Sequence, residues 1–151
     1  APNNGVTRAG IMTQDQASKL PFVTPFSKEN LEKEINKQGI KYPDIVMAQA
    51  IVESGMGRSG LFKTNNNLFG MREARNRMTT ASGSKNNFAF YKKWQDGVLD
   101  MAFFQCAYLN DLNTEDKYFL YLSSSYAETP IYVTTLKGII QKQNLKSYFN
   151  E

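Results

Sequence analysis

The chain has 151 residues, of which 41% are hydrophobic and 21% charged, and this composition is typical of one globular domain with a single core. There is no histidine, and Cys106 is the only cysteine. Hydrolases with a histidine base, zinc peptidases and internal disulfides are therefore excluded. No apolar run reaches the roughly eighteen residues that a membrane span needs.

The net charge is +4 and the pI is near 9.1. Such an excess favours polyanionic partners, such as nucleic acid, an anionic membrane surface or a carboxylate-rich polymer. The basic residues are scattered among acids, as in Glu32-Lys33-Glu34. This alternation is more typical of a solvated helix face, so the charge alone selects no partner.

Residues 1–26 contain prolines and glycines with no sustained period, and we predict an extended N-terminal arm there. The arm lacks the basic start, apolar centre and small-residue cleavage site of a secretory signal. Because the chain begins at Ala1 rather than at methionine, two explanations remain open: an export signal already removed, or a trimmed chain.

From Ser27 the pattern becomes helical. Ser27 suits the N-cap of a first helix, and Gly39 suits its end. A second helix begins at Pro43, a residue favoured in the first turn, and runs through an apolar stretch to Glu53. This second helix is apolar nearly all round, so we predict a central position for it.

Residues 70–91 lose the helical period. A turn at 82–84 followed by alternating Phe88 and Phe90 predicts a short β-hairpin lobe.

Three further helices follow the hairpin. Asp96 is expected to cap the first, and Thr114 to cap a short one that reaches Leu122. Thr129 with Pro130 is expected to begin the last. The predicted fold is therefore mainly α, in the α+β class, with a helical domain and a small β-hairpin lobe.

One carboxylate stands out because Glu53 ends an apolar run that begins at Ile45, and Gly55 and Gly57 then break the helix. Burial and the negative end of the helix dipole both raise the pKa of such a group. A carboxylic acid that stays protonated near neutral pH is what a glycosidase needs to protonate a leaving-group oxygen. Considered alone, a glutamate here is more commonly a solvated residue in the last helical turn.

Two ordered segments resemble a known family. The first comprises Ala48-Gln49-Ala50, Glu53-Ser54-Gly55, Gly57 and Asn66-Asn67-Leu68-Phe69-Gly70. The second comprises Tyr126-Ala127-Glu128-Thr129-Pro130 and Tyr132, and it is similar to a Tyr-Ala-Thr-Asp-Pro-x-Tyr motif. Both segments are similar to the glucosaminidase family of bacterial cell-wall hydrolases, which includes the flagellar muramidase-like proteins and many autolysins. With residues 88–94 between them, the resemblance extends over roughly 28–143.

The resemblance implies a lysozyme-like domain over 27–151, in which a β-hairpin lobe flanks a cleft. It implies a substrate, the glycan strands of peptidoglycan, whose peptide carboxylates would suit the positive net charge. We expect no metal, no organic cofactor and no nucleic-acid partner. We also expect a monomer that is secreted or periplasmic and acts in the cell envelope.

The resemblance also implies site residues. Glu53 would be the general acid, and Tyr126 would stabilise positive charge near the anomeric carbon or orient the sugar. The residues expected to bind substrate are Asn66, Asn67, Phe69, Gly70, Tyr91, Trp94 and Tyr132. Each aromatic has the alternative of packing in the core, and the asparagines have that of fixing a loop.

The second catalytic group is an open question, because ordinary glycosidases use two acids. In many family members the second acid resembles the glutamate of a Thr-x-Glu segment in the β-lobe, but residues 78–87 of this chain contain no acid. Glu73 is the only acid in the lobe, and Glu128 replaces the family's aspartate near Tyr126. Three mechanisms remain open: Glu73 or a water it holds acts as the base, the substrate's 2-acetamido group assists, or Glu53 acts alone as in lytic transglycosylases.

The predicted function is a peptidoglycan glycosidase of the endo-β-N-acetylglucosaminidase type, which cleaves the β-1,4 bond after N-acetylglucosamine. A lytic transglycosylase is the nearest alternative. From other classes, a non-catalytic wall-binding module and a basic nucleic-acid binder remain to be distinguished.

Overall fold

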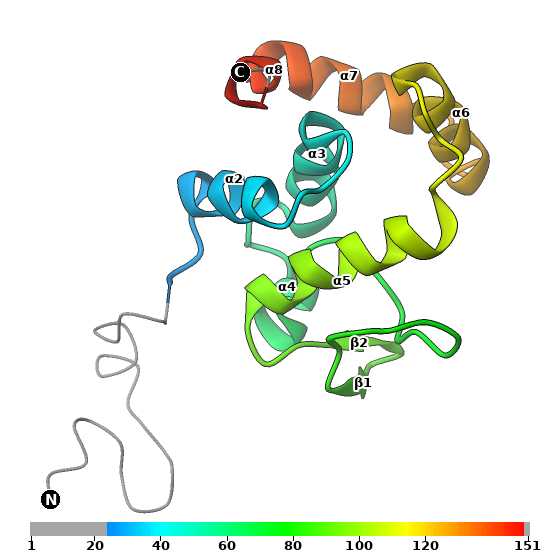
Figure 1. Cartoon of the computed structure of the whole chain (residues 1–151). Coiled ribbons are helices and arrows are strands. Elements are labelled where there is room, and N and C mark those ends of the chain that lie inside the picture. Colours follow the sequence, from blue (N-terminus) through cyan, green and yellow to red (C-terminus); the bar gives the residue numbers. More distant parts are fainter. Residues whose placement is uncertain (1–23, 150–151) are drawn as a thin grey trace, which may run out of the picture.

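The structure is a computed structural model that describes residues 24–149. Its elements are α2 (Lys28–Lys37), α3 (Pro43–Ser54), α4 (Gly60–Asn65), β1 (Gly83–Lys85), β2 (Phe88–Phe90), α5 (Trp94–Tyr108), α6 (Glu115–Ser125), α7 (Tyr132–Lys142) and α8 (Leu145–Phe149) (Figure 1). The predicted class is confirmed, because helices dominate and the described residues hold one two-stranded antiparallel sheet. Most of the predicted arm, residues 1–23, lies outside the described residues.

The core is built around α3, as its sequence predicts. Its residues Ile45, Val46 and Met47 have no exposed surface, and the helix packs against α2, α7 and α8. Burying each such side chain contributes about 1.5–3 kcal/mol to folding. Pro43 occupies the first turn, where a missing N–H costs nothing. The helix that carries Glu53 near its end is therefore held firmly by the core.

Two predicted helix caps are confirmed. The Ser27 hydroxyl accepts a hydrogen bond from the backbone N–H of Asn30 at 3.1 Å, and the Thr114 hydroxyl accepts one from the N–H of Lys117 at 3.1 Å. Each bond satisfies one of the N–H groups that the first turn of a helix leaves without a partner. The helix after Thr114 continues past the predicted end at Leu122.

Two other predicted helix starts are wrong by a few residues. Lys93 rather than Asp96 is the N-cap of α5, and Asp96 lies inside the first turn, where its charge still favours the positive end of the helix dipole. The helix α7 begins at Tyr132 after a turn in which the Thr129 carbonyl accepts from the Tyr132 N–H. Capping-type residues within one turn of a helix start can occupy either role, so sequence alone does not locate the boundary.

The predicted turn at 82–84 is also wrong, because Gly83 and Ser84 belong to strand β1. Register pairs Lys85 with Phe88, so Asn86 and Asn87 form the two-residue loop. Both asparagines have left-handed backbone angles, with φ of 56° and 68°, as a primed hairpin turn requires. Asparagine tolerates this conformation better than most residues, which is why the hairpin turns there.

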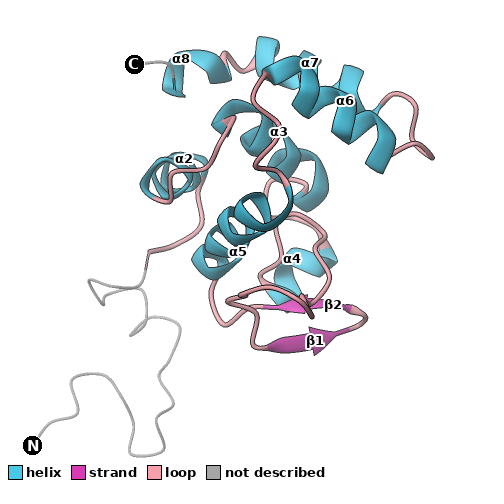
Figure 2. Cartoon of the chain, turned by 45° about the vertical axis from the view of Figure 1, so that its right-hand side comes forward, coloured by secondary structure: helices cyan, strands magenta, loops and turns pink. Residues whose placement is uncertain are grey.

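The short helices α4 and α8 were not predicted. With six and five residues respectively, neither is long enough to display a helical period in the sequence. Together with the hairpin, α4 forms the lower part of the molecule, while α6, α7 and α8 form the upper part and α5 runs between them (Figures 1 and 2). None of the described helices is both long enough and apolar enough to cross a membrane.

Candidate active site

The end of α3 is shaped by its Ser-Gly-x-Gly sequence. Gly55 adopts a left-handed conformation, with φ of 57°, and closes the helix immediately after Ser54. The Ser54 hydroxyl accepts a hydrogen bond from the Gly57 N–H at 3.1 Å and so fixes the following turn. At Gly57, with φ of 81°, a Cβ atom would lie 2.7 Å from the Phe26 ring. The chain therefore turns away sharply, and Glu53 is left in the last helical turn.

A buried asparagine holds the loop that faces Glu53. The Asn67 amide nitrogen donates to the carbonyls of Met71 and Ala89, at 2.9 and 3.0 Å. Its amide oxygen accepts from the N–H groups of Phe69 and Met71, both at 3.2 Å. Because Asn67 is only 1% exposed and its amide is used by backbone groups, it positions the Phe69–Gly70 loop rather than facing a ligand.

Gly70 brings this loop next to the acid. Its φ is +68°, and a Cβ atom placed on it would lie 3.5 Å from Oε2 of Glu53. Any other residue would be strained in that conformation, so glycine lets the loop pass close to the carboxyl group. Asn66 has a structural place as well, because it caps α4 with φ of 53° and donates to the Tyr91 carbonyl at 2.9 Å.

Two tyrosines complete the surroundings of Glu53. Tyr126 and Tyr132 stack with their ring centroids 3.9 Å apart and their planes 14° from parallel. The Tyr132 hydroxyl is buried and has no hydrogen-bond partner among residues 24–149. Burial raises the pKa of both phenols, and the nearby Glu53 charge raises it further. Both hydroxyls therefore stay protonated and available as hydrogen-bond donors.

The carboxyl group of Glu53 is partly buried, and this burial raises its pKa above the ordinary value. The neighbouring Tyr132 hydroxyl offsets the rise in part. No lysine or arginine among residues 24–149 forms an ion pair with Glu53, so no described cation holds the group in its charged form. The environment favours the protonated acid, as the apolar run before Glu53 predicts.

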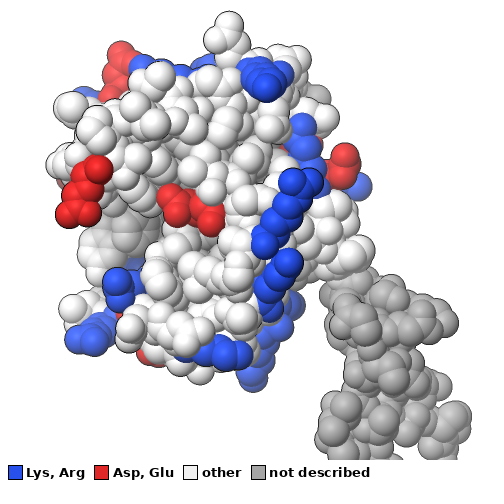
Figure 3. Space-filling view, turned by 180° about the vertical axis from the view of Figure 1, so that it is seen from behind, with Lys and Arg blue, Asp and Glu red and all other residues white. Residues whose placement is uncertain are grey.

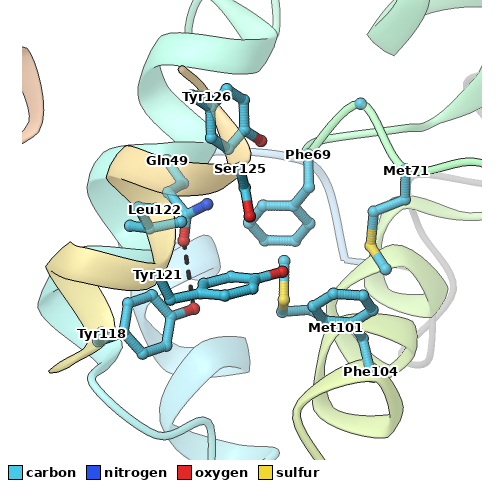
Figure 4. A pocket seen from close by; sticks show the side chains of 11 residues that line it. Gln49, Phe69, Met71, Met101, Phe104, Tyr118, Tyr121, Leu122, Ser125 and Tyr126 are labelled. Carbon is cyan, nitrogen blue, oxygen red and sulfur yellow. Dashed lines mark hydrogen bonds between the residues drawn. The ribbon is translucent and has the colours of Figure 1, made fainter. Parts of the chain in front are cut away.

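A pocket of about 230 Å³ lies near this acid, which does not itself line it. It shares Gly70 with the surroundings of Glu53 and Tyr126 with the stacked pair, and Phe69 forms part of its wall. Figure 4 shows how the side chains from several elements converge on it. The space-filling view is hollowed between the helices above and the β-lobe, residues 71–90, below (Figure 3). The arrangement suits a sugar ring, which needs both apolar faces and polar groups.

Sequence reasoning gave no role to several residues that line this pocket. Tyr118, Tyr121, Leu122 and Ser125 come from one face of α6. Gln49, the polar residue in the middle of α3, accepts a hydrogen bond from the Tyr118 hydroxyl at 3.4 Å (Figure 4). The spacing of three and four residues among the α6 side chains indicates that they share one face of a helix. Residues that pack into the core have the same spacing, so the sequence does not show that this face lines a pocket.

Of the aromatics predicted to bind substrate, Phe69 lines the pocket, whereas Tyr132, Tyr91 and Trp94 do not. Tyr91 is 1% exposed, and its hydroxyl donates to the Asp100 carboxylate. Trp94 is 6% exposed, and its indole N–H donates to the Thr24 carbonyl at 3.0 Å. The structure places both in packing positions, where a substrate cannot contact their faces.

Glu73 is also separated from the acid's pocket. It is exposed, its Oε1 accepts from the Ser84 hydroxyl at 2.9 Å, and it borders a different pocket of about 260 Å³ on the β-lobe. No acidic residue lines the pocket beside Glu53. Within residues 24–149, no three acidic or cysteine side chains gather as metal ligands would.

Comparisons with known proteins bear on the family and the fold of the chain. Residues 28–145 match the glucosaminidase family, described as mannosyl-glycoprotein endo-beta-N-acetylglucosaminidase. The crystal structure of the catalytic domain of the autolysin Auto from Listeria monocytogenes is 25% identical, with a TM-score of 0.55, and the match covers 91% of this chain and 98% of that chain. Protein bax of Escherichia coli (strain K12) is 35% identical over 74 residues, which are 49% of this chain and 24% of that protein.

The chain therefore spans about a quarter of the length of the curated relative, protein bax. The family match, by contrast, covers most of the chain and confirms the resemblance read from the two sequence segments. The chain belongs to the glucosaminidase family.

Proposed function

We propose that this chain is an N-acetylglucosaminidase that cleaves the β-1,4 bond after N-acetylglucosamine in peptidoglycan, with Glu53 as the general acid. The observation that carries the proposal is the setting of Glu53 at the partly buried end of a core helix, with a raised pKa and a sugar-sized pocket nearby. A carboxyl group that keeps its proton can give it to the glycosidic oxygen as the bond breaks.

Tyr126 has a second role in this proposal. Its ring is fixed by stacking on Tyr132, and the residue lines the pocket next to Gly70. A phenol oxygen held there would stabilise the positive charge that develops at the anomeric carbon, or would orient the ring for that change. Phe69 and Gly70 would form the floor against which the sugar lies, whereas Asn66 and Asn67 act by holding the loop.

A second candidate is a lytic transglycosylase, and one observation favours keeping it. No carboxylate lines the pocket near Glu53, and Glu73, the only acid of the β-lobe, borders a different pocket. A hydrolase with two carboxylates would place the second within about 5–10 Å of the first, across the sugar. Without it, the substrate's own 2-acetamido group would assist hydrolysis, or an internal hydroxyl of the substrate would replace water.

The experiment that separates these candidates is mass spectrometry of the fragments released from purified sacculi. New reducing ends on N-acetylglucosamine support the proposed activity, whereas 1,6-anhydro-muramic ends identify a transglycosylase. Glu53→Gln should release neither product. Binding of the wild-type chain to sacculi without any released fragment would instead identify a non-catalytic wall-binding module.

A further inference from the structure

The pocket beside Glu53 continues as a series of hollows along the β-lobe. Met71 and Phe104 line both the first pocket and a second one of about 230 Å³. Arg72 lines both this second pocket and the third, of about 260 Å³, which also holds Glu73 and Arg75. Each hollow thus shares wall residues with the next. A substrate branch that follows this row of hollows from the first pocket would reach two arginines.

The two arginines differ in how they are held. The Arg72 guanidinium lies 5.2 Å from the centroid of the Phe88 ring, and one of its nitrogens donates to the Asn87 carbonyl at 3.0 Å. These contacts use only one of its five N–H donors and fix the plane of the group. Arg75 is exposed and forms no ion pair or hydrogen bond with another residue in the range 24–149.

A third arginine of the same loop already has an ion-pair partner. Arg77 pairs with the buried Asp100 at 2.6 Å, and its guanidinium lies 5.6 Å from the centroid of the Phe104 ring. It therefore anchors the loop to α5 and supports a wall of the first two pockets, while Arg72 and Arg75 remain available to a ligand. Basic side chains are visible on the lower, β-lobe side of the hollow in Figure 3.

We propose that Arg72 and Arg75 form a subsite for carboxylate groups of the peptide that peptidoglycan carries on its glycan strand. This inference rests on the proposed function, because it assumes that the glycan lies against Glu53. Guanidinium groups match carboxylates in shape and charge and bind them with two parallel hydrogen bonds.

Glu73 lowers the positive charge of this subsite. The pocket contains two positive groups and one negative group, and the carboxylate of Glu73 already accepts from Ser84 at 2.9 Å. A purely anionic ligand gains less there than a peptide end, which carries carboxylates and an ammonium group side by side. The subsite therefore favours peptide over a phosphate polymer, for which Glu73 would be repulsive.

The test compares two substrates prepared from the same sacculi, which are first freed of phosphate polymers. One keeps its peptides, and the other has had them removed by an amidase. The variant is Arg72→Gln/Arg75→Gln. Its matched control, Lys33→Gln/Lys117→Gln, removes the same charge from exposed positions on α2 and α6. Arg72→Lys/Arg75→Lys keeps the charge but loses the two-pronged geometry, and melting temperature is measured for every protein.

We expect kcat/KM of the arginine variant to fall about three- to tenfold on peptide-bearing sacculi, the scale of two partly exposed charge pairs, and to be unchanged on stripped strands. The control should match wild type on both substrates, and the lysine variant should recover part of the loss. An equal fall on both substrates, or no fall on either, would overturn the subsite. If the wild-type chain cleaves neither substrate, the proposed function itself has failed.

Discussion

The two walls of the cleft differ in the burial and the charge of their side chains. The helical wall brings together Glu53 from α3, Tyr126 from the segment before α7, and Tyr132 from α7. Burial raises the pKa of all three side chains, which favours their uncharged forms. The β-lobe wall presents Arg72 and Arg75 to solvent on a loop. Proton transfer needs a desolvated, fixed acid, whereas recognition of a charged branch tolerates exposure. We therefore propose that the first wall carries the chemistry and that the second selects the substrate.

The largest effect should come from Glu53→Gln, which removes the transferable proton but keeps the size of the side chain. We expect turnover on sacculi to fall about 10²- to 10⁴-fold, the range for loss of a general acid. Glu128→Gln, a change of the same kind at an exposed position, is the control and should leave turnover unaltered. More than a tenth of wild-type turnover in folded Glu53→Gln protein would remove Glu53 as the acid.

Asn67→Ala tests whether the helical wall depends on the loop that faces it. Truncation leaves backbone groups of Phe69, Met71 and Ala89 without their partner, and each unsatisfied buried group costs about 1–3 kcal/mol. We expect a clear drop in the urea midpoint, together with lower activity in the fraction that stays folded. Asn36→Ala, at an exposed site, is the control, and equal midpoints for the two variants would refute the anchoring role.

Tyr126→Phe asks whether the stacked pair belongs to the chemistry or to the packing. If its hydroxyl acts on the transition state, kcat should fall by about tenfold or more with little change in KM. A packing tyrosine would instead lose about 1 kcal/mol of stability with the turnover of folded protein unchanged. Melting temperature and kcat are measured on one preparation, and a stability change alone would place Tyr126 in the core.

Glu73→Gln should have a smaller effect, since Glu73 is exposed and outside the acid's pocket. We expect turnover on peptide-free strands to stay within about threefold of wild type, the scale of surface substitutions. The fragments should carry the same chemical ends as those of wild type. A hundredfold fall in turnover would instead indicate that Glu73 binds the attacking water. The β-lobe wall would then take part in catalysis together with the helical wall.

The smallest effect concerns stability and pH. Because the pKa of Glu53 is raised in the folded chain, the folded state keeps a proton that the unfolded state releases above the ordinary pKa of 4.5. The free energy of unfolding should therefore fall as pH rises from 4.5 through the raised value. Urea titrations from pH 4 to 8 should show a steeper fall in wild type than in Glu53→Gln, because burial also raises the pKa of Glu32 and of Asp96 in both proteins. Identical pH slopes would contradict the partial burial of the Glu53 carboxyl.

The sequence by itself determined the central helix and the place of the acid. Pro43, an unbroken apolar run and two glycines predict where α3 begins and ends, because these residues act through local backbone rules. The caps at Ser27 and Thr114 were predictable for the same reason. Family resemblance added Tyr126, which no local rule distinguishes from a core tyrosine.

Only the tertiary structure decided which aromatics face the cleft. Tyr91 and Trp94 look as suitable as Phe69 in the sequence, yet Tyr91 is turned to Asp100 and Trp94 to Thr24 by partners far along the chain. Contacts between distant segments also decide which face of α6 lines the first pocket and which residues line the second pocket with Arg72. Burial and side-chain direction depend on which elements meet, and local sequence does not carry that information.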